Sequence, residues 1–190
     1  MRKIVIARHG QDEDNAKGIF NGRRDMSLTT KGREEAYTLA KNLKGHSSID
    51  IGWIFSSPLK RARETAKIVS NRLITRYSVI NSLIEMSHGI LEGRPYSDVP
   101  SFAKSWKRPD DFWYVLEVEG GESYPDLCVR AVKALAEIKQ KVEELKVSRD
   151  ILIISHGTIS KAIQVAHKGL PWEQVFNTPF FENCQFQILE

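Results

Sequence analysis

Three segments of the sequence place groups that can do chemistry directly after an apolar run. "VIARHG" presents His9, "LIISHG" presents His156, and "IFSSPLKRAR" presents Arg61. In open α/β sheets, ligands bind outside the carboxyl ends of the strands, so these side chains are expected to meet at one edge of a sheet. The glycine after each histidine leaves room for a ligand. Backbone N–H groups at a helix N-terminus, here those of Gly157 and Thr158, can receive an anion.

These residue types suit the binding and transfer of a phosphoryl group. The planar guanidinium groups of Arg8 and Arg61 match phosphate oxygens, and a protonated His156 adds another donor. His9 then lies where a nucleophile is needed, with cations around it to stabilise the charge that develops during transfer. One such histidine alone is more often a structural or surface group, whereas two His-Gly pairs with arginines nearby favour a functional site.

The elements that position these residues alternate along the chain. Apolar runs rich in β-branched residues predict strands, and apolar residues at i, i+3, i+4 and i+7 predict helices. Strands are predicted over 3–7, 51–55, 151–154 and the tail "CQFQIL", and helices over 30–44, 124–146 and 158–167. Another helix is expected after the second strand, with Ser57 as its N-cap and Pro58 at its first position. The predicted fold class is α/β, a three-layer sandwich whose mostly parallel central sheet carries helices on both faces.

The alternation of strands and helices stops between residues 86 and 121. This stretch contains several prolines and a group of aromatic residues from Phe102 to Tyr114. We interpret it as a small, partly helical lid or cap inserted into one domain that spans 1–190. A chain of 190 residues, 41% of them hydrophobic, has the size and balance for one substantial core.

Composition narrows the expected partners and location. The formal net charge is +4, but the basic residues are scattered, so a nucleic-acid ligand is not expected. The apolar runs are far shorter than the roughly 20 residues of a membrane span, and residues 1–3 lead into no signal-peptide core. We therefore expect no membrane contact and a cytoplasmic location. Cys128 and Cys184 form no C-x-x-C motif and fit free thiols in a reducing compartment.

Taken together, the motifs resemble a known family. "ARHG", Asn15, "NGRRDMSLTTKGREEA", "SSPLKRARETA", "LIEMSHGILEG", "GGES" and "ISHGT" follow one another in this order between Arg8 and about Thr158. This series resembles the histidine phosphatase superfamily, which includes the cofactor-dependent phosphoglycerate mutases. The resemblance implies a phosphoglycerate mutase-like version of the predicted fold.

The resemblance also implies a role for each matching residue. His9 is expected to be phosphorylated transiently, and Glu85 is expected to protonate the leaving oxygen and then activate water. Neither a metal nor an organic cofactor is implied. The expected phosphate contacts come from Arg8, Arg61, His156 and Asn15, and the expected substrate contacts come from the turn at Asn21 and Gly22.

Two neighbouring residues depart from the family pattern. Gln11 and Asp12 stand where many relatives have glutamate followed by threonine or serine, and that hydroxyl helps to hold phosphate. The acidic run from Asp12 to Asp14 is interpreted as a solvated turn. Close to the site, it would repel a second anionic group on the substrate. His88, three residues after Glu85, is left without an assigned role.

The favoured function is hydrolysis of phosphomonoesters, acting on a small phosphorylated metabolite as a monomer or homodimer. The mutases of the family have an arginine directly after the catalytic glutamate, a longer chain and a basic substrate loop. Here Met86 follows Glu85 and the chain has 190 residues, which favours the phosphatase branch.

Three alternatives stay open beside this function. The first is a cofactor-dependent phosphoglycerate mutase, and the second is a non-catalytic module that binds a phosphorylated ligand. The third is a metallohydrolase with His9, His156 and Glu85 as ligands. It is disfavoured because the arginines beside these residues would repel a divalent cation, and no metal ligand is therefore predicted.

Overall fold

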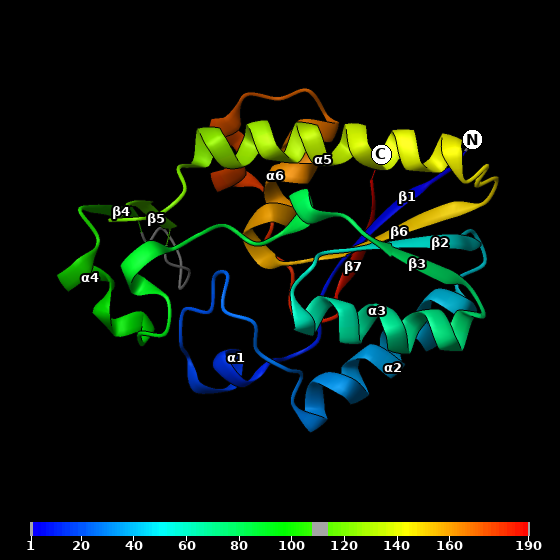
Figure 1. The fold of residues 1–190 in the computed structure, drawn as a ribbon, viewed down its shortest axis with the longest axis horizontal. Helices are drawn as coiled ribbons and strands as arrows, with labels where there is room; N and C mark the ends of the chain where they lie inside the picture. The colour runs from blue at the N-terminus through cyan, green and yellow to red at the C-terminus, as the bar shows by residue number, and fades with distance from the viewer. Residues whose placement is uncertain (1, 108–113, 190) are drawn as a thin grey trace.

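A five-stranded mixed sheet forms the centre of the fold (Figure 1). The computed structural model describes residues 2–107 and 114–189. The strand order is β3-β2-β6-β1-β7, and β7 at one edge runs antiparallel to β1 while the other neighbours pair in parallel. The strands are β1 (Ile4–Arg8), β2 (Ile51–Ser56), β3 (Arg76–Val79), β6 (Asp150–Ser155) and β7 (Phe186–Leu189). The predicted mostly parallel sheet is confirmed.

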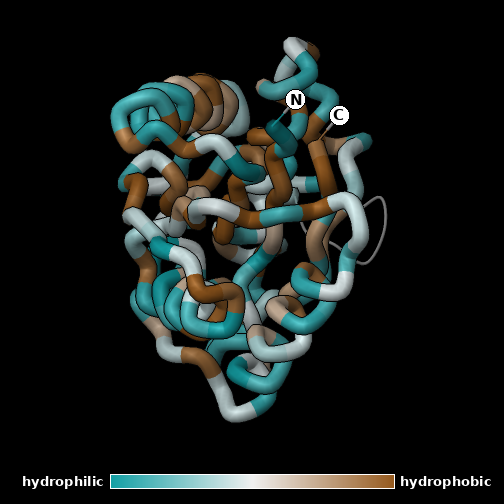
Figure 2. The backbone as a smooth tube through the Cα atoms, turned by 90° about the vertical axis from the view of Figure 1, so that its right-hand side faces the viewer, coloured by the Kyte–Doolittle hydropathy of each residue, from teal (hydrophilic) through white to brown (hydrophobic). Residues whose placement is uncertain are grey.

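Helices cover both faces of this sheet and complete the predicted three layers. Side chains alternate along β1, so Val5 and Ala7 pack toward one pair of helices and Ile6 packs toward the other pair. Figure 1 places α5 and α6 on one face and α2 and α3 on the other, and Figure 2 shows hydrophobic strand segments in the interior. The helices are α2 (Thr30–Gly45), α3 (Lys60–Leu73), α5 (Tyr124–Glu144) and α6 (Gly157–His167).

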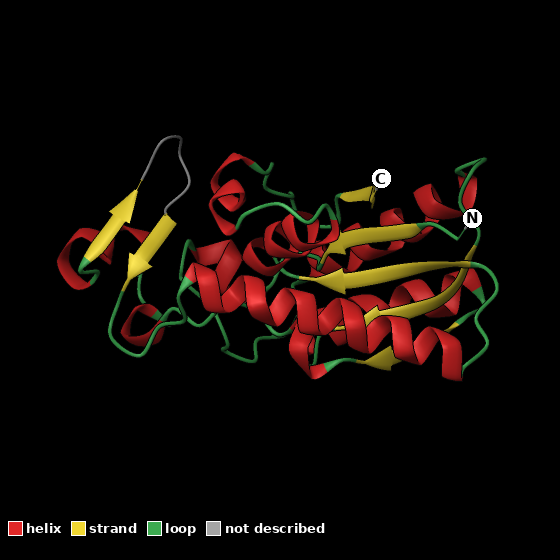
Figure 3. Ribbon diagram, turned by 90° about the horizontal axis from the view of Figure 1, so that it is seen from above, coloured by secondary structure: helices red, strands yellow, loops and turns green. Residues whose placement is uncertain are grey.

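The segment predicted as a lid contains short elements of its own. Figure 3 shows the antiparallel pair β4 and β5 standing apart from the central sheet, beyond the N-terminal end of α5. A small apolar cluster, in which Leu91, Val99 and Val115 surround Phe20, anchors the segment. Residues 108–113, which hold part of the predicted aromatic group, lie outside the described residues. The elements are η2 (Gly89–Leu91), η3 (Tyr96–Asp98), α4 (Val99–Phe102), β4 (Ser105–Lys107) and β5 (Tyr114–Glu117), with η denoting a 3-10 helix.

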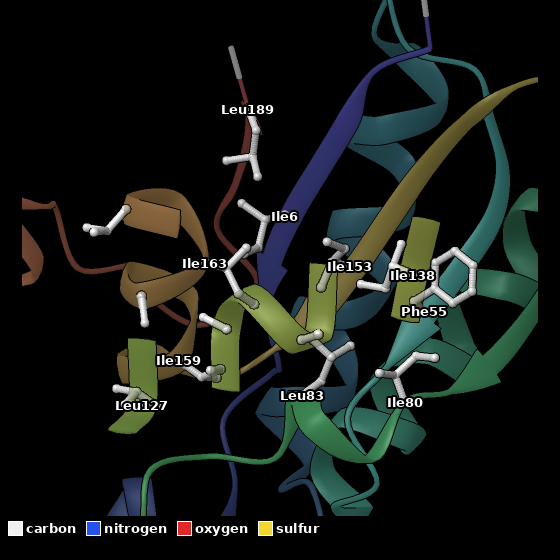
Figure 4. Packing of buried hydrophobic residues seen from close by; sticks show 14 of the residues in the cluster. Ile6, Phe55, Ile80, Leu83, Leu127, Ile138, Ile153, Ile159, Ile163 and Leu189 are labelled. Carbon is white, nitrogen blue, oxygen red and sulfur yellow. The ribbon is translucent and has the colours of Figure 1, made fainter. Parts of the chain in front are cut away.

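The larger core lies between the sheet and the helices α5 and α6 (Figure 4). α5 begins at a Ser123 N-cap, as predicted, and turns one apolar face inward along its whole length. Leu127 and Ile138 of this face belong to the same core cluster as Ile153 of β6, and all three are almost fully buried. Each such side chain contributes roughly 1.5–3 kcal/mol to stability. This packing fixes α5 and α6 over the sheet.

The register of β1 and β6 decides where the two His-Gly pairs lie. Ile4 is paired with Ile151, and Arg8 is paired with Ser155, without a shift between them. His9 and His156 are the next residue of each parallel strand, so they emerge side by side at the carboxyl edge of the sheet.

Two local predictions were wrong. α3 begins at Lys60 rather than Pro58, and its N-cap is Leu59. The hydroxyl of Ser57 lies 2.6 Å from Nε2 of His156 and accepts from the N–H of Leu59 at 3.3 Å. The acidic run after β1 is not a solvated turn. Asp12 is fully buried and caps a short helix, α1 (Glu13–Lys17), by accepting a hydrogen bond from the backbone of Asn15.

Two more 3-10 helices lie outside the predicted lid segment. They are η1 (Asn81–Leu83) and η4 (Trp172–Asn177). Within 2–107 and 114–189, no helix is long and apolar enough to cross a membrane.

A close backbone contact joins the loop after β1 to the start of α2. A Cβ atom added to Gly32 would lie 2.0 Å from the carbonyl oxygen of Gln11. Gly32→Ala is therefore expected to lower the free energy of unfolding by about 1–3 kcal/mol, in line with other overpacked sites. Urea denaturation monitored by circular dichroism measures this change.

Gly45→Ala is the matched control at the other end of the same helix, where an added Cβ meets nothing within 4 Å. Because alanine is the better helix former, this variant is expected to be unchanged or more stable by up to about 1 kcal/mol. Equal effects of the two substitutions would contradict the proposed steric cause.

Candidate active site

Arg61, His9 and His156 form a compact cluster at the carboxyl edge of the sheet. Arg61 and His156 are fully buried, and His9 is 2% exposed. Nε of Arg61 lies 3.1 Å from Nε2 of His9 and 3.2 Å from Nδ1 of His156. The two imidazole rings meet edge to face with centroids 5.0 Å apart. The structure thus brings together three residues that the sequence predicted to share a site.

The guanidinium of Arg61 is held from several sides. Nη1 donates to the carbonyl of Arg24 at 2.6 Å, and Nη2 donates to the carbonyl of Gly22 at 2.7 Å. Nε also lies 3.2 Å from Oδ2 of Asp12. Gly22 has a φ of 44°, which suits glycine in this tight turn. Gly22 was predicted to contact substrate, whereas the contact seen here is the one that positions Arg61.

The hydrogen bonds of His9 define which ring nitrogen is free to react. Nδ1 lies 2.7 Å from the carbonyl oxygen of Gly10, so Nδ1 carries the proton and donates it. Nε2 therefore has a lone pair and accepts from Arg61. Burial, followed by Arg61 and Arg8, holds the pKa of His9 well below its usual range. The result is a neutral imidazole with a nucleophilic nitrogen in a cationic environment.

His156 is also neutral in this arrangement. Its Nδ1 accepts from Arg61, and its Nε2 donates to the hydroxyl of Ser57. Burial and the charge of Arg61 hold the pKa of His156 well below its usual range. A protonated His156 was predicted to donate to phosphate, whereas in this structure the proton on Nε2 is donated to Ser57.

Arg8 extends from the end of β1 beside this cluster. Its Nη1 donates to the carbonyl of Phe181 at 2.9 Å, and its guanidinium carbon lies 4.8 Å from the ring centroid of Phe180. Its Nε is buried and has no hydrogen-bond partner among the described residues. A buried N–H of a permanent cation without an acceptor is suited to receive an anion.

Glu85 lies at the N-terminus of α6. Its carboxylate accepts hydrogen bonds from the backbone N–H groups of Met86 at 2.8 Å, Ile159 at 3.0 Å and Thr158 at 3.1 Å. The N–H of Thr158 was predicted to receive the substrate anion and instead donates to Glu85 in this structure. Gly157 allows Phe180 to pack closely, because an added Cβ would lie 2.3 Å from that ring.

Arg130 of α5, which the sequence analysis missed, holds the backbone around Glu85. Nη1 donates to the carbonyl of Ser82 at 2.9 Å and to that of Ile84 at 2.5 Å, and Nη2 donates to that of Glu85 at 3.3 Å. Glu122 accepts from Nε of Arg130 at 2.8 Å and fixes its orientation. The motif "GGES" in the sequence includes Glu122, whereas Arg130 belongs to no motif and its position in a helix does not indicate a role in the site.

Asn15 and Asn21, both predicted to contact the ligand, converge on Asp12. Asn21 donates through Nδ2 to Oδ2 of Asp12 at 2.5 Å, and the backbone N–H of Asn15 donates to Oδ1 at 2.7 Å. Asn183, another residue that the sequence analysis missed, donates to the side-chain oxygen of Asn15 at 3.3 Å. Asp12 thus lies inside the predicted phosphate-binding group.

His88 lies at the start of the predicted lid segment, 86–121, and packs against Phe20. Its ring packs edge to face on Phe20 with centroids 5.0 Å apart. It is 7% exposed, and burial lowers its pKa. This position fits a structural role.

Comparison with known proteins places the chain among enzymes of phosphate chemistry. A family model described as the histidine phosphatase superfamily (branch 1) matches residues 4–190. A 2,3-bisphosphoglycerate-dependent phosphoglycerate mutase of Bartonella bacilliformis is 30% identical over 185 residues, which cover 92% of this chain and 85% of the mutase. A glucosyl-3-phosphoglycerate phosphatase of Mycolicibacterium vanbaalenii is 30% identical over 178 residues, which cover 90% of this chain and 76% of the phosphatase.

The same assignment follows from solved structures. A mycobacterial glucosyl-3-phosphoglycerate phosphatase in complex with VO3 superposes with a TM-score of 0.82 at 25% identity. The match covers 100% of this chain and 91% of that protein. The resemblance inferred from the motifs, and the fold that it implied, are confirmed.

The free energy of unfolding is expected to fall as the pH drops below about 6.5, the ordinary pKa of histidine. Burial lowers the pKa of His9, His156 and His88, so just below pH 6.5 the unfolded chain binds protons that the folded chain does not. The stabilisation is therefore complete above that pH and is lost below it, by up to about 1.4 kcal/mol per pH unit for each histidine. Urea denaturation over a pH series measures the slope.

His9→Asn is expected to reduce this slope, because it removes one of the buried imidazoles. His46→Gln changes a solvent-exposed histidine and should leave the slope in place. A wild-type stability that does not change with pH in this window would rule out neutral, buried histidines.

Proposed function

Because the chain belongs to the histidine phosphatase superfamily (branch 1), we propose that it hydrolyses phosphomonoesters through a phosphohistidine intermediate on His9. One observation carries the proposal. Nε2 of His9 has its lone pair available, since Nδ1 donates to Gly10, and it lies 3.1 Å from the buried guanidinium of Arg61. A neutral nucleophile beside a fixed cation suits attack on a phosphoryl group.

In the first step, Nε2 of His9 attacks phosphorus while the bond to the ester oxygen breaks. Glu85 donates a proton to the departing alkoxide. Arg8 and Arg61 hold the oxygens of the phosphoryl group, whose charge is spread over them during transfer. The buried, unpartnered Nε of Arg8 supports its part in this step.

In the second step, water attacks the phosphohistidine. Glu85, now a carboxylate, takes a proton from the water as the P–N bond breaks, and His9 and inorganic phosphate are released. Arg130 acts only through position, because its hydrogen bonds to the carbonyls of Ser82, Ile84 and Glu85 fix the loop that carries the carboxyl group.

Hydrolysis is favoured over the mutase reaction by the residue after Glu85. The relatives include both phosphatases and mutases, so their names alone do not decide the question. The motif resemblance implies an arginine at this position in the mutases of the family. Met86 is 1% exposed and packs in the larger core, so it offers no cation there.

A metal-dependent reaction is disfavoured by the position of Arg61. Its Nε lies between the ring nitrogens of His9 and His156, where a divalent ion shared by the two histidines would have to lie. A fixed positive charge at that point repels such an ion. We therefore propose a reaction without metal or organic cofactor.

The proposed substrates are small phosphorylated metabolites. The relatives named above act on phosphoglycerate or glucosyl-3-phosphoglycerate, and the structural relative binds VO3. We expect the predicted lid segment, 86–121, to determine which of these small phosphate esters the chain prefers.

The covalent intermediate gives a direct test. Rapid mixing with a phosphomonoester, followed by alkaline quenching and mass spectrometry, is expected to show one acid-labile phosphoryl group on His9. His9→Ala should lose the adduct and reduce turnover by several orders of magnitude, because the first step has no nucleophile. Ser57→Ala, which removes the hydroxyl partner of His156 and of the N–H of Leu59 but leaves His9 unchanged, should retain the adduct. A phosphoryl group on another residue would falsify the assignment.

Substitution of Glu85 tests the proton transfer. Glu85→Gln is expected to reduce kcat/KM for alkyl phosphates by roughly 10²–10⁴-fold, the usual contribution of a general acid. The loss should be much smaller for 4-nitrophenyl phosphate, whose leaving group departs without a proton. Glu117→Gln, at an exposed position of β5, is the control. An equal loss for both substrates would assign Glu85 a structural role instead.

A further inference from the structure

Asp12 is the departure from the family pattern that the proposed mechanism does not use. It stands where many relatives carry a hydroxyl residue, and its side chain is fully buried. Oδ1 is occupied by the helix cap, because it accepts from the backbone of Asn15. Oδ2 faces the site, where it lies 2.5 Å from Nδ2 of Asn21 and 3.2 Å from Nε of Arg61.

The contact with Arg61 creates a conflict with the substrate. Nε of Arg61 is the atom that also faces His9, so a phosphoryl oxygen held for attack must share it with Oδ2 of Asp12. Two anionic oxygens that contact the same Nε atom repel each other strongly in a buried site. A hydroxyl at the same position would instead donate a hydrogen bond to the phosphoryl group.

A carboxyl group can remove the conflict by taking up a proton. The neutral acid has one O–H donor, as a hydroxyl does, and it no longer competes for the guanidinium. Asp12 cannot easily move away, because its other oxygen caps α1 and is itself part of the capping box with Asn15.

Burial favours this protonation, whereas the surrounding charges act in both directions. Burial raises its pKa above the usual range, and Asp14 in the same helix acts in the same direction. Arg61 on α3 and Arg8 on β1 oppose the shift, as does the N–H of Asn15.

Three further titratable side chains lie around this contact between Asp12 and Arg61. Tyr96 of η3 interacts electrostatically with it, and burial raises the pKa of that phenol, so Tyr96 stays neutral. His9 and His156 face the same Nε of Arg61 and are neutral. An arriving dianion therefore adds negative charge beside Asp12 without a compensating new cation.

We propose that Asp12 takes up one proton when the phosphoryl group binds, and that the resulting acid donates to a phosphoryl oxygen while Nε of Arg61 turns from Asp12 to the ligand. This inference rests on the proposed function, since it concerns the same phosphoryl group. It makes Asp12 the residue that sets the pH range of binding. Above the pKa of free Asp12, the affinity for a dianion falls by about tenfold per pH unit.

Binding of sulfate measures this step without turnover. Sulfate has the shape and charge of a phosphoryl dianion but carries no proton near neutral pH, so proton uptake must occur on the protein. Titration calorimetry in two buffers of different ionisation enthalpy is expected to show uptake of about one proton per sulfate above the pKa of Asp12, and none below it.

Asp12→Asn is the decisive variant, because asparagine also caps helices well and has no titratable proton. It should bind sulfate without proton uptake and with an affinity that no longer depends on pH in this range. Glu13→Gln removes the same charge from an exposed neighbour and should behave as the wild type.

Proton uptake that persists in Asp12→Asn would transfer the proton to Glu85, His9 or His156 and overturn the inference. Sulfate binding without uptake in the wild type, or no sulfate binding by either protein, would overturn it as well. If sulfate binding takes up a proton but the protein shows no turnover, only the phosphatase proposal is refuted. If the protein shows turnover but binds sulfate without proton uptake, only the role of Asp12 is refuted.

Discussion

The buried guanidinium of Arg61 is the constraint on which the site depends. An unpaired charge in a protein interior is strongly unfavourable, so this side chain requires acceptors from its surroundings. They come from separate parts of the chain: the carboxylate of Asp12, the carbonyls of Gly22 and Arg24, and two imidazoles. Segments that follow β1 and β6 therefore fold around one group at the start of α3. Burial and the charge of Arg61 together lower the pKa of both histidines. The buried cation therefore also keeps His9 neutral, which is the form that can act as a nucleophile.

The two halves of the site are supported by different parts of the fold. Arg8 and the two imidazoles are placed by the register of the parallel strands β1 and β6, which leaves little freedom because each strand is apolar on both faces. Arg61 is placed by the start of α3. Glu85 comes from a connection without regular secondary structure and needs other support. The start of α6 supplies N–H donors to its carboxylate, and Arg130 binds the carbonyls of the preceding residues. Glu85 is therefore held by the positive N-terminus of α6 on one side and by the cation Arg130 on the other, and not by a strand.

Sequence patterns predicted the parts of this structure that local order determines. β1, β2 and β6 were evident from continuous apolar runs, and the motifs identified the residues that meet at their ends. The pattern did not reveal the burial of Asp12, because that depends on a cation remote in sequence, nor the role of Arg130, whose helical position alone resembles a surface residue. β3 was missed because it is a short edge strand with mostly exposed side chains, so its sequence lacks a buried face. Contacts between distant residues therefore account for most of what was not foreseen.

The final strand and the turn before it fasten the nucleophile in place. Phe181 accepts from Arg8, Asn183 donates to the carbonyl of His9, and the N–H of Cys184 reaches the same stretch of backbone. Polypeptides are synthesised from the N-terminus, so His9 leaves the ribosome long before these partners exist. A nascent chain that ends before residue 180 carries every predicted catalytic side chain yet lacks the groups that hold the first two. The contacts that hold Arg8 and His9 can therefore form only after residues 181–184 have been synthesised.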